Sequence, residues 1–314
     1  MDTILTLSYF VIFSMLGYLT RSGIQGLNTY PGAPFHGLVW AQVCGCAFMG
    51  FLQTENVMFP TDSTNKPLLL ALTTGYCGSV TTFSSWMLEM FLGMGNIEPS
   101  YTRAKGDGFL SLVSIFSITL LMAFAALLYG KRVGSTTHLW TIKSHRLLRP
   151  FPAKTHTAVR IFLSLLAVCF YVGAALYTAF STSYAHRKFG FGLVFSPIGA
   201  LLRLYLSLWL NKSSAYLPWG TFAANILGTL ILSIMFMIPR ICHVSDISRS
   251  VLYGVQNGFC GALTTLSTFL NELHKLPDKK AYIYGALSVF VGYALVLIVD
   301  GSTAWGHGYT VEYL

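Results

Sequence analysis

The chain has 314 residues, of which 54% are hydrophobic and only 10% charged, and its formal net charge is +9. Soluble domains carry about 25% charged residues, so this composition excludes an ordinary soluble protein and favours one that spans a membrane. Because the basic residues gather between the apolar runs, we expect them to face the cytoplasm and anionic lipid, not nucleic acid.

Nine apolar stretches are long enough to cross a bilayer, which takes about 20 residues as a helix. The first follows Asp2, without the basic segment of a signal peptide, so we interpret it as a spanning helix. We therefore predict an all-α integral membrane protein with nine transmembrane helices. They cover residues 4–22, 37–53, 67–92, 108–130, 159–180, 190–210, 218–238, 251–273 and 281–300.

The third and eighth spans carry copies of one unusual motif, Gly75–Trp86 and Gly258–Phe269. In each copy glycines interrupt an apolar stretch, threonines and serines follow, and a glutamate comes later at the same spacing, as Glu89 and Glu272. Lipid tolerates no unpaired backbone groups, so protein or a pore must surround such a broken helix. Interrupted helices in both halves of a chain indicate an ion or substrate site.

The repeat extends beyond this motif, because Gly17 and Arg21 match Gly199 and Arg203 at a nearly constant offset. We infer that one four-helix unit has been duplicated. Residues 1–130 form the first repeat and residues 190–314 the second. Residues 131–189 hold a basic loop, residues 131–157, and a linker transmembrane helix that has no counterpart in either repeat.

The lysines and arginines predict the topology. The basic loop is expected to be cytoplasmic because it contains Lys131, Arg132, Lys143, Arg146, Arg149 and Lys154. Counting spans from it places the N-terminus in the cytoplasm and the C-terminus outside. Arg187 and Lys188 then fall outside, against the rule. The linker helix makes the second repeat start on the opposite side, so the two four-helix repeats are inverted, which is typical of transport proteins.

These motifs together resemble those of the Fluc/FEX fluoride channel family. They are the double Gly-x-x-Thr-Thr-x-Ser segment, the Gly-Thr-x-x-x-Asn-x-x-Gly of residues 220–228 and the Gly-x-x-x-Arg that ends at Arg21 and Arg203. The four-plus-one-plus-four layout is similar to the eukaryotic, fused two-domain branch. The resemblance implies a passive, fluoride-selective exporter of the plasma membrane that confers fluoride resistance. It also implies a monomer equivalent to an antiparallel two-unit dimer, with two pores and a structural sodium ion (Na+) at the centre.

A fluoride pore must replace the water of the ion with hydrogen-bond donors and still release it. Amides and hydroxyls are donors, and an aromatic ring presents a positive edge to an anion. In the family each pore combines the first aromatic position of one unit with the second position of the other. This pairs Phe83 with Phe269, and Leu266 with Trp86, so we expect one working pore. Its predicted lining is Phe83, Phe269, Asn225, Thr82, Ser84, Thr265, Ser267 and Ser114.

An alternative for the hydroxyls is that they bond their own backbone or a neighbouring helix. Gln42 occupies in the first half the place of Asn225 in the second, and the sequence leaves open which pore it faces. Arg21 and Arg203 are predicted either to bind anions at a vestibule or to extend to lipid headgroups. The carboxylates of Glu89 and Glu272 repel fluoride, so we expect them to have a structural or gating role.

The resemblance places the sodium ion on backbone carbonyls of Gly78, Thr81, Gly261 and Thr264, the alternative being small residues for close helix crossing. We predict no enzyme, because no phosphate-binding loop, metal-ligand cluster or nucleophile paired with a base is present. Two other classes stay open, a proton-coupled secondary anion transporter of the same inverted design and a non-conducting membrane scaffold.

Overall fold

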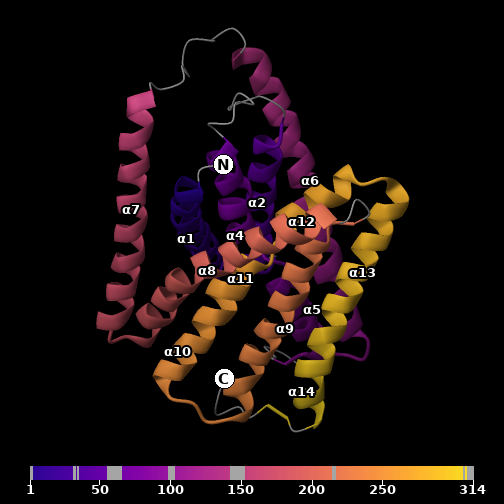
Figure 1. Ribbon diagram of the computed structural model, residues 1–314. Helices are drawn as coiled ribbons and strands as arrows, with labels where there is room; N and C mark the ends of the chain where they lie inside the picture. The colour runs from indigo at the N-terminus through magenta and orange to yellow at the C-terminus, as the bar shows by residue number, and fades with distance from the viewer. Residues whose placement is uncertain are drawn as a thin grey trace.

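The computed structural model describes residues 3–30, 33, 35–54, 66–97, 103–141, 153–213, 217–306 and 308–309, and these are helical apart from turns and short connections (Figure 1). The first half contains α1 (Thr3–Leu27), α2 (Gly37–Leu52), α3 (Lys66–Leu70), η1 (Ala71–Cys77), α4 (Gly78–Val80), α5 (Phe83–Gly95) and α6 (Asp107–Thr141). Helix α7 (Ala153–Phe180) follows. The second half contains α8 (Tyr184–Ser213), α9 (Trp219–Ile241), α10 (Asp246–Gly254), η3 (Val255–Cys260), α11 (Gly261–Leu263), α12 (Leu266–Lys275), α13 (Asp278–Val296), η4 (Leu297–Gly301) and α14 (Ser302–Gly306).

The protein is a multi-pass, all-helical membrane protein. Six of the described helical segments are long and apolar enough to cross a bilayer, and α2 is a shorter apolar helix of 16 residues. Large apolar side chains cover the outside of the bundle, for example Phe180 on α7, Leu121 on α6 and Phe290 on α13, which are 81%, 67% and 74% exposed. Such a surface is stable against lipid and not against water.

The two motif segments are broken helices with the same local structure. A π-helical stretch, η1 or η3, runs into one helical turn, and the chain then becomes extended at two threonines. These are Thr81 and Thr82 in the first segment and Thr264 and Thr265 in the second. Threonine suits extended backbone because its branched side chain is restricted in a helix. The glycines were expected to break the helix, but Gly78 and Gly261 are themselves helical.

The basic loop predicted for residues 131–157 is shorter than expected. Helix α6 continues through Lys131 and Arg132 to Thr141, and α7 already begins at Ala153, so Lys154 is helical too. Lys143, Arg146 and Arg149 lie outside the described residues. The apolar pattern ends at the membrane boundary, but a helix can continue beyond it, because each added residue gains one backbone hydrogen bond once the helix has formed.

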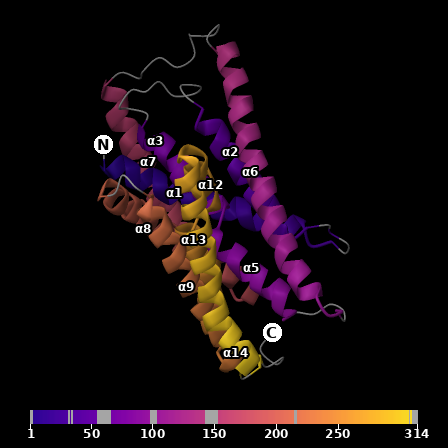
Figure 2. The ribbon, with the colours of Figure 1, turned by 90° about the vertical axis from the view of Figure 1, so that its right-hand side faces the viewer.

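The helices around the broken segments form two groups. Helix α6 runs beside α2 and α5, whereas α13 runs beside α9 and α5. In Figure 2, α6 and α8 are drawn on opposite sides of α13. Helix α7 stands at the left edge of Figure 1 and packs on α1 and α8. The broken segments therefore lie inside the bundle, with a different long helix on each side.

Candidate functional site

The two helix breaks meet and exchange hydroxyl contacts. The Thr81 hydroxyl lies 2.9 Å from the Ser267 hydroxyl and accepts the Ser267 N–H at 3.1 Å. The Thr264 hydroxyl has the equivalent contacts with Ser84, at 2.9 and 3.2 Å. All four side chains are fully buried. These hydroxyls therefore bond the neighbouring broken helix, which was one of the two alternatives, and the role of the predicted hydroxyls in a pore stays a prediction.

Thr82 and Thr265 have a second task at the breaks, because each caps the helix that follows. The Thr82 side chain accepts the Ser85 N–H and the Thr265 side chain accepts the Thr268 N–H. Such N-caps satisfy otherwise unpaired backbone donors of α5 and α12. The caps thus satisfy backbone donors at the breaks, as a membrane interior requires.

An amide side chain fixes the extended residue at each break. Asn225 accepts the Thr265 N–H at 2.8 Å and donates to the Thr265 carbonyl at 3.3 Å. Gln42 makes the same pair of bonds to Thr82, at 3.2 and 2.6 Å. The glutamine therefore preserves the backbone clamp of the asparagine, although its side chain is longer.

The two arginines cross between the halves. Arg21 donates to the Gly261 carbonyl at 2.8 Å and to the Asn257 carbonyl, whereas Arg203 donates to the carbonyls of Gly78 at 2.9 Å, Thr264 at 3.2 Å and Thr74. Both side chains are buried, so they do not extend to lipid headgroups, which was one of the two interpretations.

Only glycine fits beneath each guanidinium. A Cβ atom at Gly78 would lie 2.5 Å from Arg203 Cζ, and one at Gly261 would lie 2.7 Å from Arg21 Cζ. The glycines of the motif therefore allow a close approach of the opposite arginine. This role, unlike helix breaking, depends on a contact far away in the sequence.

Phe83 and Phe269 meet on the side of α13. Their ring centres are 5.6 Å apart at 69°, an edge contact, and the Phe269 ring lies 5.3 Å from that of Tyr284. Helix α13 presents Tyr284, Ser288 and Gly292, four residues apart and all buried, along this face. A Cβ atom at Gly292 would lie 2.8 Å from the Phe83 ring. The Ser288 hydroxyl is buried and has no hydrogen-bond partner among the described residues.

Trp86 lies between Phe83 and α6. Its ring meets that of Phe83 in an edge contact at 5.8 Å and 86°, stacks on Phe116 at 5.6 Å and 13°, and donates from Nε1 to the Ile115 carbonyl at 3.4 Å. Leu266 is fully buried in an apolar cluster that also contains Trp86, Phe83 and Phe269. Ser114 was predicted to line the pore, but it lies on the exposed face of α6. The buried hydroxyl of this helix is that of Thr119, which has no hydrogen-bond partner among the described residues.

The helix packing relates the amides to these two sides. Asn225 lies on α9, which packs against α5 and α13, and so belongs with Phe83 and Phe269. Gln42 lies on α2, which packs against α6 and also against α12, the helix that carries Phe269. The helix packing alone therefore does not assign Gln42 to one side.

The glutamates differ between the halves. Glu272 accepts hydrogen bonds from Thr221 at 2.6 Å and from Tyr284 at 2.9 Å. One carboxylate oxygen of Glu89, Oε2, has no hydrogen-bond partner in the described part of the chain. Sequence reasoning missed Tyr284 and Thr221 as neighbours of the site. The four-residue spacing of Tyr284, Ser288 and Gly292 in the sequence could have predicted the buried face of α13.

Comparison with known proteins shows which family the chain resembles. The profile of the family described as "CrcB-like protein, Camphor Resistance (CrcB)" matches residues 8–131 and again residues 191–300. No solved structure matches the chain.

Several curated proteins resemble the chain over most of its length. "Fluoride export protein 1" of Schizosaccharomyces pombe is 56% identical over 99% of this chain and 100% of the relative. "Fluoride export protein 1" of Candida albicans is 31% identical over 93% of this chain and 78% of the relative. The "Fluoride-specific ion channel FluC" of Leptospira interrogans is 33% identical over 33% of this chain and 77% of its own length. The chain therefore belongs to the CrcB-like family.

Proposed function

We propose that the chain is a passive fluoride channel that lets fluoride leave the cytoplasm and so confers fluoride resistance. The observation that carries this proposal is the buried edge contact of Phe83 and Phe269 beside the unsatisfied hydroxyl of Ser288. The names of the related export proteins and of the bacterial channel agree with it. Membership of a channel family also argues against an enzyme.

The ion would pass along α13 on the Phe83 side, a name we use for Phe83, Phe269, Tyr284, Ser288 and Asn225. Positive ring edges, a hydroxyl donor and the second N–H of Asn225 Nδ2 can replace the water shell of fluoride. None of these groups carries a full charge, which keeps binding weak enough for release. Four hydroxyl residues at the helix breaks stay predicted pore residues and would line the path where it passes the breaks. They are Thr82, Ser84, Thr265 and Ser267.

One side is proposed to conduct. On the Trp86 side, defined as Trp86, Leu266, Phe116 and Gln42, the indole is stacked and hydrogen-bonded, and a leucine replaces the first phenylalanine. Arg21 and Arg203 would raise the anion concentration near the breaks, in keeping with a vestibule role. Glu272 would hold Tyr284 in place, and Glu89 is proposed as a gating residue.

Nine spans in two inverted repeats are the proposed architecture. The crossed arginine and hydroxyl contacts join equivalent positions of the two halves, which supports an antiparallel pair within one chain. The two family matches leave out most of residues 131–189, the proposed linker segment. We propose a monomer in the plasma membrane with its N-terminus in the cytoplasm and its C-terminus outside.

The central sodium ion is also a proposal. Its predicted ligands are carbonyl oxygens, which replace the water of a small cation, and they belong to Gly78, Thr81, Gly261 and Thr264. Three of them, those of Gly78, Gly261 and Thr264, already accept from arginine. A carbonyl has a second lone pair that could face the ion, but both guanidinium groups would lie close to it and repel it, which lowers the affinity that this donor set can give. When bound, sodium would supply positive charge between the two breaks.

A fluoride efflux measurement tests the function. Purified protein in liposomes should release fluoride in response to a potassium diffusion potential, without a pH gradient. Chloride efflux at a similar rate would overturn fluoride selectivity. A strict need for a pH gradient would favour the proton-coupled transporter, and no flux at all would favour the scaffold.

The architecture and the sodium ion have separate tests. An epitope after Leu314 should be reached by antibody on intact cells, and one before Met1 only after permeabilisation. Both ends on one side would contradict the inverted repeat. For the ion, the thermal midpoint should be higher in sodium than in N-methylglucamine buffer, and equal midpoints would argue against the site.

A further inference from the structure

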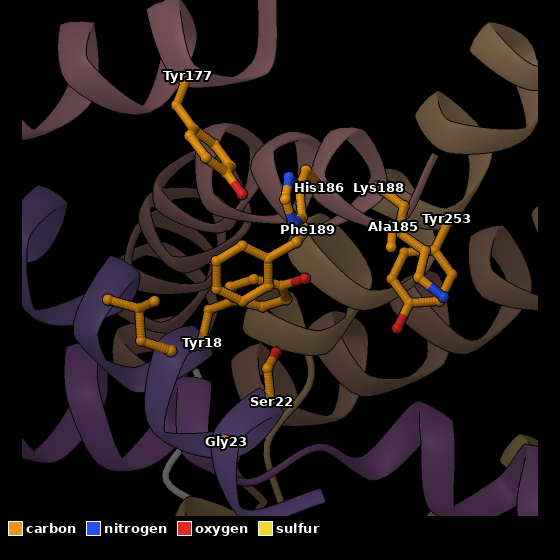
Figure 3. Close-up of a pocket in the computed structure, with 10 residues that line it drawn as sticks. Tyr18, Ser22, Gly23, Tyr177, Ala185, His186, Lys188, Phe189 and Tyr253 are labelled. Atoms are coloured by element: carbon orange, nitrogen blue, oxygen red, sulfur yellow. The ribbon is translucent and has the colours of Figure 1, made fainter. Parts of the chain in front are cut away.

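A pocket of about 400 Å³ lies away from both sides of the broken segments, where α1, α7, α8 and α10 come together (Figure 3). Its lining residues are Tyr18, Leu19, Ser22, Gly23, Tyr177, Ala185, His186, Lys188, Phe189 and Tyr253. Pockets for small ligands have about 300–1,000 Å³, so this volume suits a small molecule or a headgroup and far exceeds a fluoride ion. Neither Phe83 nor Trp86 lines it, so it is distinct from the proposed pore.

The chemistry of the lining is that of an anion site. Lys188 supplies a positive charge, His186 a ring N–H, and Tyr18, Ser22, Tyr177 and Tyr253 supply hydroxyl donors. No carboxylate is among the described lining residues. Arg21 lies directly behind the wall, with its guanidinium carbon 5.5 Å from the centre of the Tyr18 ring. The local charge is therefore positive and uncompensated within the pocket.

Three aromatic contacts hold the basic groups in place. The Lys188 ammonium lies 4.9 Å from the centre of the Tyr253 ring and 5.4 Å from that of Tyr184. The His186 ring lies 6.2 Å from the ring of Tyr177, whose hydroxyl points into the pocket in Figure 3. Cation–π contacts leave the N–H groups of an ammonium available for an anion. The site is thus preorganised, not merely a lysine extending into water.

The position of the pocket explains a departure in the sequence. Arg187 and Lys188 fall on the predicted outer side, against the usual distribution of basic residues. Arg187 donates to the Ser181 and Thr182 carbonyls and so closes the end of α7. Lys188 instead lines the pocket, together with the exposed Tyr177 of α7.

We propose that this pocket binds a phosphate group, and that the bound group ties the linker helix α7 to α1 and α8. A lysine with several hydroxyl donors and a histidine matches the oxygens of a phosphate or phosphate ester. The group has two possible sources, the headgroup of a phospholipid at the outer membrane surface and free phosphate in solution. Because the pocket is separate from the pore, this site can exist whether or not the chain conducts fluoride.

Three probes test the proposal on the full chain in detergent, with the thermal midpoint followed as a function of probe concentration. They are inorganic phosphate, dioctanoyl phosphatidylglycerol, and dioctanoylglycerol, which has the same acyl chains without phosphate. We expect a saturable rise with at least one phosphate probe and none with dioctanoylglycerol. A rise with phosphatidylglycerol alone identifies a lipid, and a rise with both identifies the phosphate group itself.

Matched variants make the test specific. Lys188→Gln should weaken the affinity at least roughly tenfold, the usual cost of losing one hydrogen bond to a charged group. Lys279→Gln, which removes the same charge from an exposed position on α13, should leave it unchanged. If Lys188→Gln does not fold, Tyr177→Phe and Ser22→Ala replace it. The proposal would be overturned if wild type and the pocket variants bound the phosphate probe with equal affinity. An equal rise of the thermal midpoint with dioctanoylglycerol would also overturn it. Unchanged fluoride efflux in the variants would show that the pocket acts separately from the channel.

Discussion

The Phe83 side and the Trp86 side share one scaffold and differ in what fills it. Both have an amide clamp, a capping threonine and an arginine that bonds a backbone carbonyl of the other half. On the Phe83 side, two phenylalanine rings meet in a T-shaped edge contact next to α13, where the Ser288 hydroxyl has no hydrogen-bond partner among the described residues. On the Trp86 side, the indole stacks on Phe116 and donates to the backbone.

A duplicated unit must satisfy its buried backbone groups, and it must form a pore wall if it conducts. The difference between the two sides separates these two requirements. The clamps and arginines satisfy buried backbone groups, which any helix break inside a membrane needs, so both halves must keep them. The pore wall is needed only where an ion passes. One half can therefore lose its pore chemistry without losing its fold.

The largest effect is expected from Phe269→Ile or Phe83→Ile. Either change removes a positive ring edge from the Phe83 side while keeping an apolar side chain, so fluoride efflux from liposomes should fall below detection. Leu266→Ile, a change of similar size in the other half of the crossed pairing, serves as the control and should keep most of the flux. Comparable losses in all three variants would show that the pairing of the rings is wrong.

The second prediction compares the two amide clamps. Asn225→Asp and Gln42→Glu each replace a donor to a backbone carbonyl with a carboxylate. Each should therefore lower the free energy of unfolding by about 1–3 kcal/mol. Only Asn225→Asp puts negative charge beside the proposed ion path, so it alone should abolish efflux. Thermal unfolding checks that the two variants lose the same free energy of unfolding. If Gln42→Glu folds well but no longer passes fluoride, Gln42 lies on the conducting side.

Membrane-spanning helices and the approximate positions of the breaks could be predicted from the sequence, because apolar runs and interrupted motifs are local patterns. It did not identify the crossed arginines, since a bond from Arg21 to Gly261 joins distant residues and has no local signal. The capping role of Thr82 lay within reach, because a threonine before a helix is a common cap. The π-helices η1 and η3 leave no comparable signature.

The prediction that Ser114 lines the pore was wrong for a different reason. Lipid is as apolar as the interior of the bundle, so hydropathy does not tell which face of a long apolar helix points inward. Ser114 and Thr119 are both plausible by composition, yet only Thr119 is buried. On α13 the small and polar residues recur every four positions, and that regular spacing marks the buried face more clearly.

A smaller effect is expected from the two unsatisfied hydroxyls. Neither Ser288 nor Thr119 has a hydrogen-bond partner in the described part of the chain, so Ser288→Ala and Thr119→Val should cost little stability. Ser288→Ala should nevertheless slow efflux roughly tenfold, because the ion loses one donor during passage. Thr119→Val should leave efflux unchanged. Slower fluoride efflux in Thr119→Val than in Ser288→Ala would contradict the assignment of the ion path to α13.

The smallest effect is expected from Trp86→Phe. The indole hydrogen bond to the Ile115 carbonyl is lost, which should lower the free energy of unfolding by about 1 kcal/mol, while a ring still stacks on Phe116. Efflux should stay at the wild-type rate, because restoring one phenylalanine leaves Leu266 and Gln42 in place and does not rebuild a path along α6. Efflux from liposomes and urea unfolding measure the two quantities. A clear gain in efflux would mean that the indole alone closes the second side, and that the two halves differ by one gate, not by a whole pore wall.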